Sequence, residues 1–129
     1  MPGSFLLDTN IAVALLAGED AVRASLNQGG LTFLSSIVVG ELFYGARKSS
    51  RVVSNLSKVE ELAAKFVVLN CDVSTARHYG KIRELLRAKG RPIPENDIWI
   101  AAHAQQYDLT LVTRDAHFSA VDGIRIEAW

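Results

Sequence analysis

The sequence predicts a three-layer α/β domain whose central, mostly parallel sheet is flanked by helices. Short apolar runs stand at residues 5–7, 31–34, 65–69, 109–113 and 124–126. None of them alternates polar with apolar residues, and this is typical of strands buried on both faces. Segments with helical patterning lie between the runs, and strands that alternate with helices indicate a parallel sheet.

The first three strands are each joined to a predicted helix. The run at 5–7 leads into IAVALLAG, and the run at 31–34 leads into SIVVGELFYGARKS, where Ser35 or Ser36 is the expected cap. A third helix, SNLSKVEELAAK, precedes the run at 65–69. These connections have the strand-to-helix order of an α/β fold.

The second half of the chain holds the clearest helix, which runs from Asp72 as N-cap to Gly90 as stop signal. Pro92 and Pro94 then enforce an extended loop, and a further helix runs from about residue 96 to 107. The direction of the last strand is left open.

Length and composition favour one domain, which we expect to span residues 1–129. Apolar residues make up 49% of the chain, which argues against disorder, yet no apolar stretch approaches the ~20 residues of a membrane span. The first residues, MPGSFLLDTN, have no basic region and no cleavage-site pattern, so we expect no signal peptide. A single cysteine, Cys71, fits a reducing cytoplasm.

Two acids are expected at the edge of the sheet where ligands bind. Asp8 directly follows the first strand, and Asp115 follows LTLVT by two residues. In open α/β sheets ligands bind beyond the carboxyl ends of the strands. The alternative for each acid is a turn or helix cap, the commoner role of aspartate at such places.

Two further acids stand in apolar helices. Glu41 lies in IVVGELFYGA, where apolar residues occupy every helical face, so we expect a buried helix. Its alternatives are a side chain that reaches solvent or pairs with Arg47. Asp97 precedes five apolar residues, with Asn96 as the better cap by type and Glu95 just outside the helix. A carboxylate in that first turn is favoured by the helix dipole but needs no capping role.

No obvious basic partner exists for each of these four acids, and a divalent cation would satisfy them together. Ligands that are all oxygen point to Mg²⁺ or Mn²⁺ and not to zinc. The three histidines lack zinc-site spacing, and neither a G-x-S-x-G elbow nor a phosphate-binding glycine loop is present. We expect His103, Trp99 and Trp129 to belong to the core. Asp8 as a phosphotransfer nucleophile is disfavoured, because Asn10 stands where that pattern has a second Asp.

Four segments of the sequence resemble PIN-domain ribonucleases, and VapC-type toxins of bacterial toxin–antitoxin pairs in particular. The segments are FLLDTN, SSIVVGELFYGARKS, PIPENDIWIAAHA and LVTRDAHFSAVDGIRIEAW, in the family's order and spacing. The resemblance covers Phe5 to Trp129. The family's acidic set falls on the four acids above, namely Asp8, Glu41, Asp97 and Asp115, and its flanking polar positions fall on Asn10 and Thr113.

The resemblance implies a PIN-like fold and a metal-dependent endoribonuclease. It implies that Asp8, Asp97 and Asp115 hold one or two Mg²⁺ or Mn²⁺ ions, directly or through water, and that Glu41 ligates or positions the water. Asn10 and Thr113 would orient the carboxylates. The attack would be in line and leave a 5′-phosphate and a 3′-hydroxyl.

Binding of RNA by this chain needs local positive charge, because the formal net charge is zero. Residues 77–91 hold six basic side chains and one acidic one, and Arg83, Arg87 and Arg91 are spaced four apart. They form either a strip for phosphates or a solvated helix face. A second candidate patch consists of Arg47, Lys48 and Arg51.

Partners follow from the resemblance as well: a homodimer and a small VapB-like antitoxin whose C-terminal segment covers the active site. IAVALLAG and the LFY of the 37–47 helix supply either a groove for the antitoxin or plain core. Two other functions stay open, a catalytically silent module that binds antitoxin or RNA, and a nuclease directed at DNA. The intact acidic set argues against the first, and the small size of the chain argues against the second.

Overall fold

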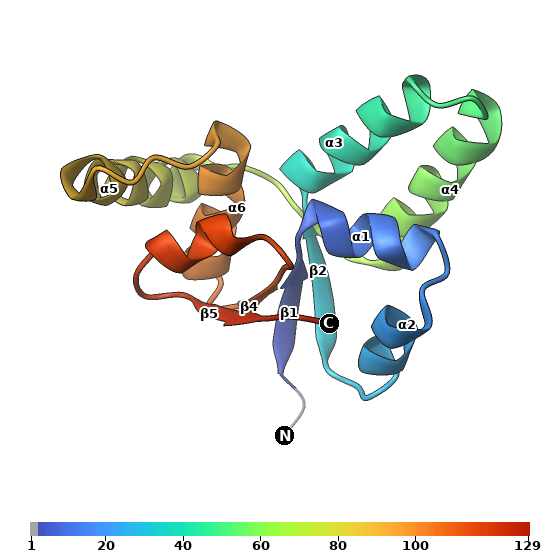
Figure 1. Cartoon of the computed structure of the whole chain (residues 1–129), viewed down its shortest axis with the longest axis horizontal. Coiled ribbons are helices and arrows are strands. Elements are labelled where there is room, and N and C mark those ends of the chain that lie inside the picture. Colours follow the sequence, from blue (N-terminus) through green and yellow to red (C-terminus); the bar gives the residue numbers. More distant parts are fainter. Residues whose placement is uncertain (1–2) are drawn as a thin grey trace.

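The computed structural model describes residues 3–129 and contains a five-stranded sheet in which every pairing is parallel (Figure 1). The strands are β1 (Ser4–Leu7), β2 (Leu31–Ser35), β3 (Val67–Leu69), β4 (Thr110–Val112) and β5 (Arg125–Glu127). Their order is β3-β2-β1-β4-β5, which puts β1 at the centre. The predicted three-layer α/β fold is confirmed, and the open question of the last strand is settled as parallel.

Six α-helices flank this sheet (Figure 1). They are α1 (Thr9–Leu16), α2 (Asp20–Leu26), α3 (Ser36–Arg47), α4 (Val52–Lys65), α5 (Val73–Lys89) and α6 (Glu95–Gln106), with a short 3-10 helix η1 (Ala116–Ala120) before β5. Sequence patterning missed α2 and η1, which are short and offer little periodicity. Within residues 3–129 no helix is long and apolar enough to cross a membrane. The expectation about a signal peptide concerns in part residues 1 and 2, outside the described range.

The core lies between the sheet and its helices. Leu6 and Leu7 of β1, Leu34 of β2, and Leu111 and Val112 of β4 are fully or almost fully buried. This burial on both faces is what the non-alternating apolar runs predicted. Helix α6 packs its residues 100–104 into the same core.

Helix α3 departs from expectation, because it is not buried on every side. Val38, Leu42 and Ala46 are buried, but Tyr44 is 67% exposed and Gly40 also faces solvent. The reason is the position of α3, which pairs with α4 in an arm that projects beyond the sheet (Figure 1). The expectation that Glu41 lies in a fully buried helix was therefore wrong, although Glu41 still lines the cleft at the predicted site.

The start of α6 also differs from the prediction, in which Asn96 was the cap. The N-cap is Pro94, whose extended backbone (φ −52°, ψ 143°) already turns the chain into the helix, and its carbonyl accepts from the Asp97 N–H at 3.0 Å. Glu95 and Asn96 therefore lie inside the first turn. Asp97 shares that turn, as expected, and the side chain of Asn96 is free to face the surface.

Candidate active site

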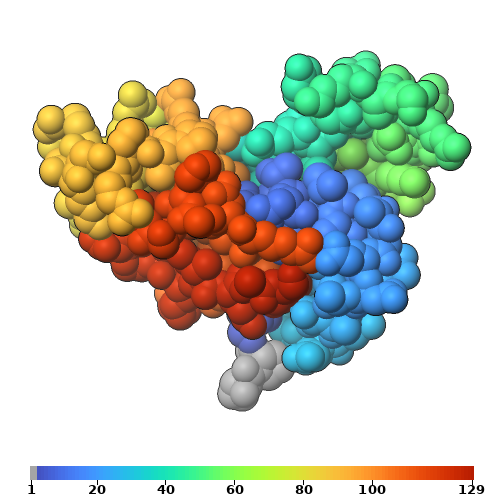
Figure 2. Space-filling model, viewed as in Figure 1, coloured from blue at the N-terminus to red at the C-terminus, as the bar shows by residue number. Residues whose placement is uncertain are grey.

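A cleft of about 750 Å³ opens where β1 and β4 end and where α6 begins. Figure 2 shows the surface hollowed between the α3–α4 arm and the lobe formed by α5 and α6. All four predicted acids line this cleft, together with Thr9, Asn10, Val13, Pro94, Glu95, Asn96 and His117. The structure thus brings together side chains that lie more than 100 positions apart in the sequence.

Asp8 is the most buried of the four acids, with 4% of its surface exposed. It ends β1 and caps α1, and its Oδ1 accepts from the Thr9 N–H at 2.8 Å. Its Oδ2 accepts from the buried Thr113 hydroxyl at 2.7 Å. Burial raises the pKa of Asp8, and the hydrogen bond from Thr113 opposes that rise. Asp8 therefore does serve as a helix cap through Oδ1, as the alternative held, while Oδ2 is bound by Thr113.

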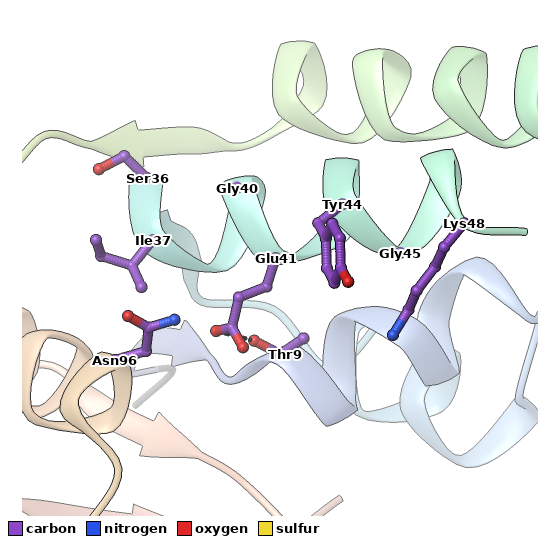
Figure 3. Close-up of a pocket in the computed structure, with 9 residues that line it drawn as sticks. All are labelled: Thr9, Ser36, Ile37, Gly40, Glu41, Tyr44, Gly45, Lys48 and Asn96. Carbon is purple, nitrogen blue, oxygen red and sulfur yellow. Dashed lines mark hydrogen bonds between the residues drawn. The ribbon is translucent and has the colours of Figure 1, made fainter.

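Glu41 reaches the cleft from the side, out of α3. Its Oε1 accepts from the Thr9 hydroxyl at 2.9 Å (Figure 3). The hydroxyl fixes one carboxylate oxygen and leaves the other open to the cleft. The suggested pairing with Arg47 is not the one formed.

Asp97 carries the largest electrostatic perturbation in the site. Its side chain is 15% exposed. Its pKa is raised from 3.8 to about 6, chiefly by burial and then by the charges of Asp8, Asp115 and Glu41, while His117 opposes the rise. Four carboxylates in one cleft therefore repel one another when no cation is bound.

Asp115 is held by the loop that follows β4. Its N–H donates to the Thr113 hydroxyl at 2.9 Å, and its Oδ1 accepts from the His117 N–H at 2.9 Å. Thr113 thus joins Asp8 to Asp115 through one hydroxyl. Asn10 braces the same loop, because its Oδ1 accepts from the Arg114 N–H at 3.3 Å. Both flanking polar residues therefore form hydrogen bonds beside the carboxylates, and their role in orienting them stays a prediction.

His117 is the residue that sequence reasoning missed. Its Nδ1 lies 3.0 Å from Asp115 Oδ1 and 3.5 Å from Asp97 Oδ2. The only sequence signal is its place two residues after Asp115, because the 3-10 turn puts both residues in the wall of the cleft.

His103, in contrast, is a core histidine as predicted. It is fully buried, with its two ring nitrogens near the Ser35 hydroxyl (2.9 Å) and the Asn70 carbonyl (3.2 Å).

The donor set fits a hard divalent cation. Ligand atoms of Asp97, Asp115 and His117 lie within 4.8 Å of one another, and Asp8 and Glu41 line the same cleft. Mostly carboxylate oxygen suits Mg²⁺ or Mn²⁺, and a cation would offset the repulsion that raises the pKa of Asp97. The ligand and catalytic roles of the individual residues stay predictions.

The predicted basic strip lies on the solvent side of α5. Arg83 donates to the Tyr79 hydroxyl at 2.5 Å and lies 3.4 Å from Glu95 at the cleft rim. Arg87 forms two hydrogen bonds with Glu84, at 2.7 and 3.0 Å. Arg91 is exposed just beyond the helix. These charges are thus partly compensated, and only Arg83 contacts a residue of the cleft.

The second patch surrounds the far end of α3. Arg47 and Arg51 are exposed, and Lys48 places its Nζ 4.9 Å from the centre of the Tyr44 ring.

The two predicted core tryptophans are half-buried: Trp129 packs edge-on against Phe5, and Trp99 stacks on Tyr79 with ring centres 4.0 Å apart.

The all-parallel sheet, with a carboxylate cleft at the end of its central strand, defines an α/β domain with a candidate metal site at the carboxyl edge of the sheet. Comparison with known proteins gives the family. The PIN domain profile matches residues 5–124, and the chain belongs to the PIN-domain family. It is 39% identical, over 97% of each chain, to the tRNA(fMet)-specific endonuclease VapC of Shigella flexneri. It is 36% identical to ribonuclease VapC2 of Haemophilus influenzae, with the same coverage.

Solved structures agree with this assignment. The VapBC2 structure of Rickettsia felis, bound to a promoter DNA fragment, superposes with a TM-score of 0.91 at 30% identity, over 98% of both chains. The DNA-bound VapBC structure of Salmonella typhimurium superposes with a TM-score of 0.88 at 38% identity, over 100% of this chain and 99% of the other.

Proposed function

We propose that this protein is an endoribonuclease that depends on Mg²⁺ or Mn²⁺ and serves as the toxin of a toxin–antitoxin pair. The observation that carries the proposal is the gathering of Asp8, Glu41, Asp97 and Asp115 in one cleft at the end of the central strand. The relatives named VapC ribonuclease, matched over nearly their full length, support RNA as the substrate.

Asp8, Asp97 and Asp115 would hold the cation, with Glu41 as a further ligand or as the group that orients water. Such a cation lowers the pKa of water and offsets negative charge on the scissile phosphate. The protein's part is to fix the carboxylates. The Thr113 hydroxyl holds Asp8 and the loop of Asp115, and the Thr9 hydroxyl holds Glu41. Positioning by such hydrogen bonds limits the reorganisation needed at the moment of reaction.

The partner is a small VapB-like antitoxin, in keeping with the similar solved structures, which are VapBC complexes. A groove of about 370 Å³ between α1, α3 and α4 offers it a place. Its walls combine aliphatic side chains with polar ones, namely Val13, Leu16, Leu42 and Val59 with Thr9, Glu41, Asn55 and Lys58. For IAVALLAG and LFY the sequence left open a groove for the antitoxin or plain core. Both hold in part: Val13 is 51% exposed, whereas Ile11 is fully buried. We also propose a homodimer, and a cytoplasmic location where RNA and antitoxin are both present.

Cleavage of labelled RNA and of matched DNA tests the function. We expect RNA to be cut in Mg²⁺ or Mn²⁺, and neither nucleic acid in excess EDTA or in Ca²⁺, which is a poorer Lewis acid in looser geometry. Asp8→Asn, purified in parallel, is the control for contaminating nuclease. RNA cleavage that persists in EDTA would overturn the mechanism. Preferential DNA cleavage would favour the DNA-directed alternative, and binding without cleavage the silent module.

A further inference from the structure

A second groove leads away from the carboxylates along the other side of α3. It measures about 640 Å³ and is lined by Thr9, Ser36, Ile37, Gly40, Glu41, Tyr44, Gly45, Lys48 and Asn96 (Figure 3). Thr9, Glu41 and Asn96 belong to both the acid cleft and this groove, so the two are continuous. A polymer whose reacting phosphate lies at the acids therefore has a direct path into it.

Side chains of three different kinds follow one another along this groove: an acid, an aromatic ring and a base. Glu41 and Tyr44 on α3 and Lys48, the C-cap of that helix, follow one another at helical spacing, and Figure 3 shows the Tyr44 ring between the other two side chains. Seven residues of helix span roughly 10 Å. The three residues thus follow one another over a length of backbone that suits one or two nucleotides. The Lys48 Nζ lies 4.9 Å from the centre of the Tyr44 ring, where it is able to meet a phosphate beside a stacked base.

The glycines of α3 keep the groove open and serve no packing purpose. A Cβ added at Gly40 or Gly45 would meet no atom within 4 Å. Glycine inside a helix makes the helix less stable than alanine would. The stability of the fold therefore does not explain either residue. Their effect is to leave these two positions of the groove wall without a side chain.

The opposite wall of the groove carries a polar side chain, Asn96. Asn96 projects from α6 toward Ile37 and Glu41 (Figure 3), because the helix is capped by Pro94 and not by this amide. An amide offers both a donor and an acceptor, which suits the edge of a base.

We propose that Tyr44 is the stacking platform for an unpaired RNA base next to the scissile phosphate, with Lys48 on the adjoining phosphate and Asn96 at the base edge. This inference rests on the proposed ribonuclease function. RNA suits this groove better than a protein segment does, because an exposed aromatic ring lies in its wall and the groove is continuous with the acid cleft. The groove between α1, α3 and α4 also holds a cation and an amide, Lys58 and Asn55, but its walls have aliphatic side chains and no aromatic ring. Bases stack on aromatic rings largely regardless of sequence.

Binding is measured in the Asp97→Asn background, which removes cleavage, by fluorescence anisotropy of a mixed-sequence single-stranded RNA of about 12 nucleotides. Tyr44→Ala is expected to weaken binding roughly 5- to 100-fold, and Tyr44→Phe to retain it. Lys48→Gln should weaken binding and flatten its salt dependence. The matched controls are Tyr107→Ala, another exposed tyrosine, and Lys65→Gln, a lysine likewise set over an aromatic ring.

Two further measurements isolate the stacking. A 2-aminopurine base placed beside the cleavage site should lose fluorescence on binding to the parent and to Tyr44→Phe, but not to Tyr44→Ala. Gly40→Leu should melt no lower than the parent, since the space is open, yet bind RNA more weakly because the new side chain fills the groove.

The outcomes distinguish failure of the Tyr44 base-stacking site from failure of the proposed ribonuclease function. A parent that neither binds nor cuts RNA refutes the function, and the subsite with it. A parent that cuts RNA while Tyr44→Ala binds and quenches as the parent does refutes the subsite alone. Tyr44→Ala that leaves RNA affinity intact but releases a co-expressed antitoxin, or changes the oligomeric state, assigns the groove to a protein and overturns the inference.

Discussion

Replacing Asp97 with asparagine tests whether this residue serves the cation or the helix. The pKa of Asp97 is raised from 3.8 to about 6, and one pKa unit corresponds to about 1.36 kcal/mol. Keeping Asp97 ionised in the folded, metal-free protein therefore costs about 3 kcal/mol. The favourable effect of the helix dipole on a first-turn carboxylate is about 0.3–1 kcal/mol. Repulsion and burial outweigh the dipole, so Asp97→Asn should melt higher than the parent without metal.

The pH dependence of this difference has a definite sign. A carboxyl group whose folded pKa is raised costs no stability while it is protonated in both states. The cost develops as pH rises from about 4 through about 6, and it is complete at roughly pH 7 and above. The variant and the parent should accordingly melt together near pH 4 and diverge by several degrees at neutral pH. Glu60→Gln, an exposed charge removal on α4, controls for net charge.

Added Mn²⁺ should reverse the ranking. A ligand that binds only the folded state stabilises it by about 2.7 kcal/mol at a hundredfold excess over its dissociation constant. The parent should show this gain, and Asp97→Asn should lose most of it along with RNA cleavage. Thermal melts across pH, with and without Mn²⁺, make the measurement. If the variant melts clearly lower without metal, still responds to Mn²⁺ and still cuts RNA, Asp97 is only structural.

Three other changes probe the surroundings of the site. Removing charge at Arg83 and Arg87 should weaken RNA binding and flatten its salt dependence without changing the melting temperature, and an unchanged salt slope would make this a solvated helix face. His117→Ala should raise the pKa of Asp97 above about 6 in the metal-free protein, because His117 opposes that rise; a carboxyl NMR titration that shows no change contradicts the coupling. Thr113→Val should destabilise the protein at neutral pH by about 1.5–3 kcal/mol, since buried Asp8 loses a hydrogen bond. That loss should shrink at low pH, and Thr113→Ser should restore stability in denaturant titrations.

The sequence placed Asp8 and Asp115 correctly because a parallel sheet leaves little freedom at its carboxyl edge. Both acids come after strands that pair directly, and the register of β1 with β4 aligns Leu7 with Val112. Strand type and strand ends are readable from apolar runs. Residues just beyond the end of one strand therefore lie close to residues just beyond the end of its neighbour.

Glu41 was placed in the site for a reason that the structure does not support. An apolar helix was taken as buried, but α3 leaves Tyr44 exposed and lines a groove on each side. Composition alone does not distinguish a helix in the core from one with apolar surface for other molecules. His117 was missed because its proximity to Asp97 depends on how the loop after β4 turns, which no periodicity encodes.

The bond from the Thr113 hydroxyl to Asp8 joins residues 105 positions apart, and this separation has a consequence for synthesis. A chain emerges from the ribosome N-terminus first, and a domain generally folds as a unit. Until β4 is available to pair with β1, Asp8 lacks its hydroxyl donor and the cleft lacks Asp115. The order of strands in the sheet therefore delays the assembly of the cleft until synthesis is nearly finished. A product truncated before β4 would lack both Asp115 and the partner strand of β1, and with them the means to cut.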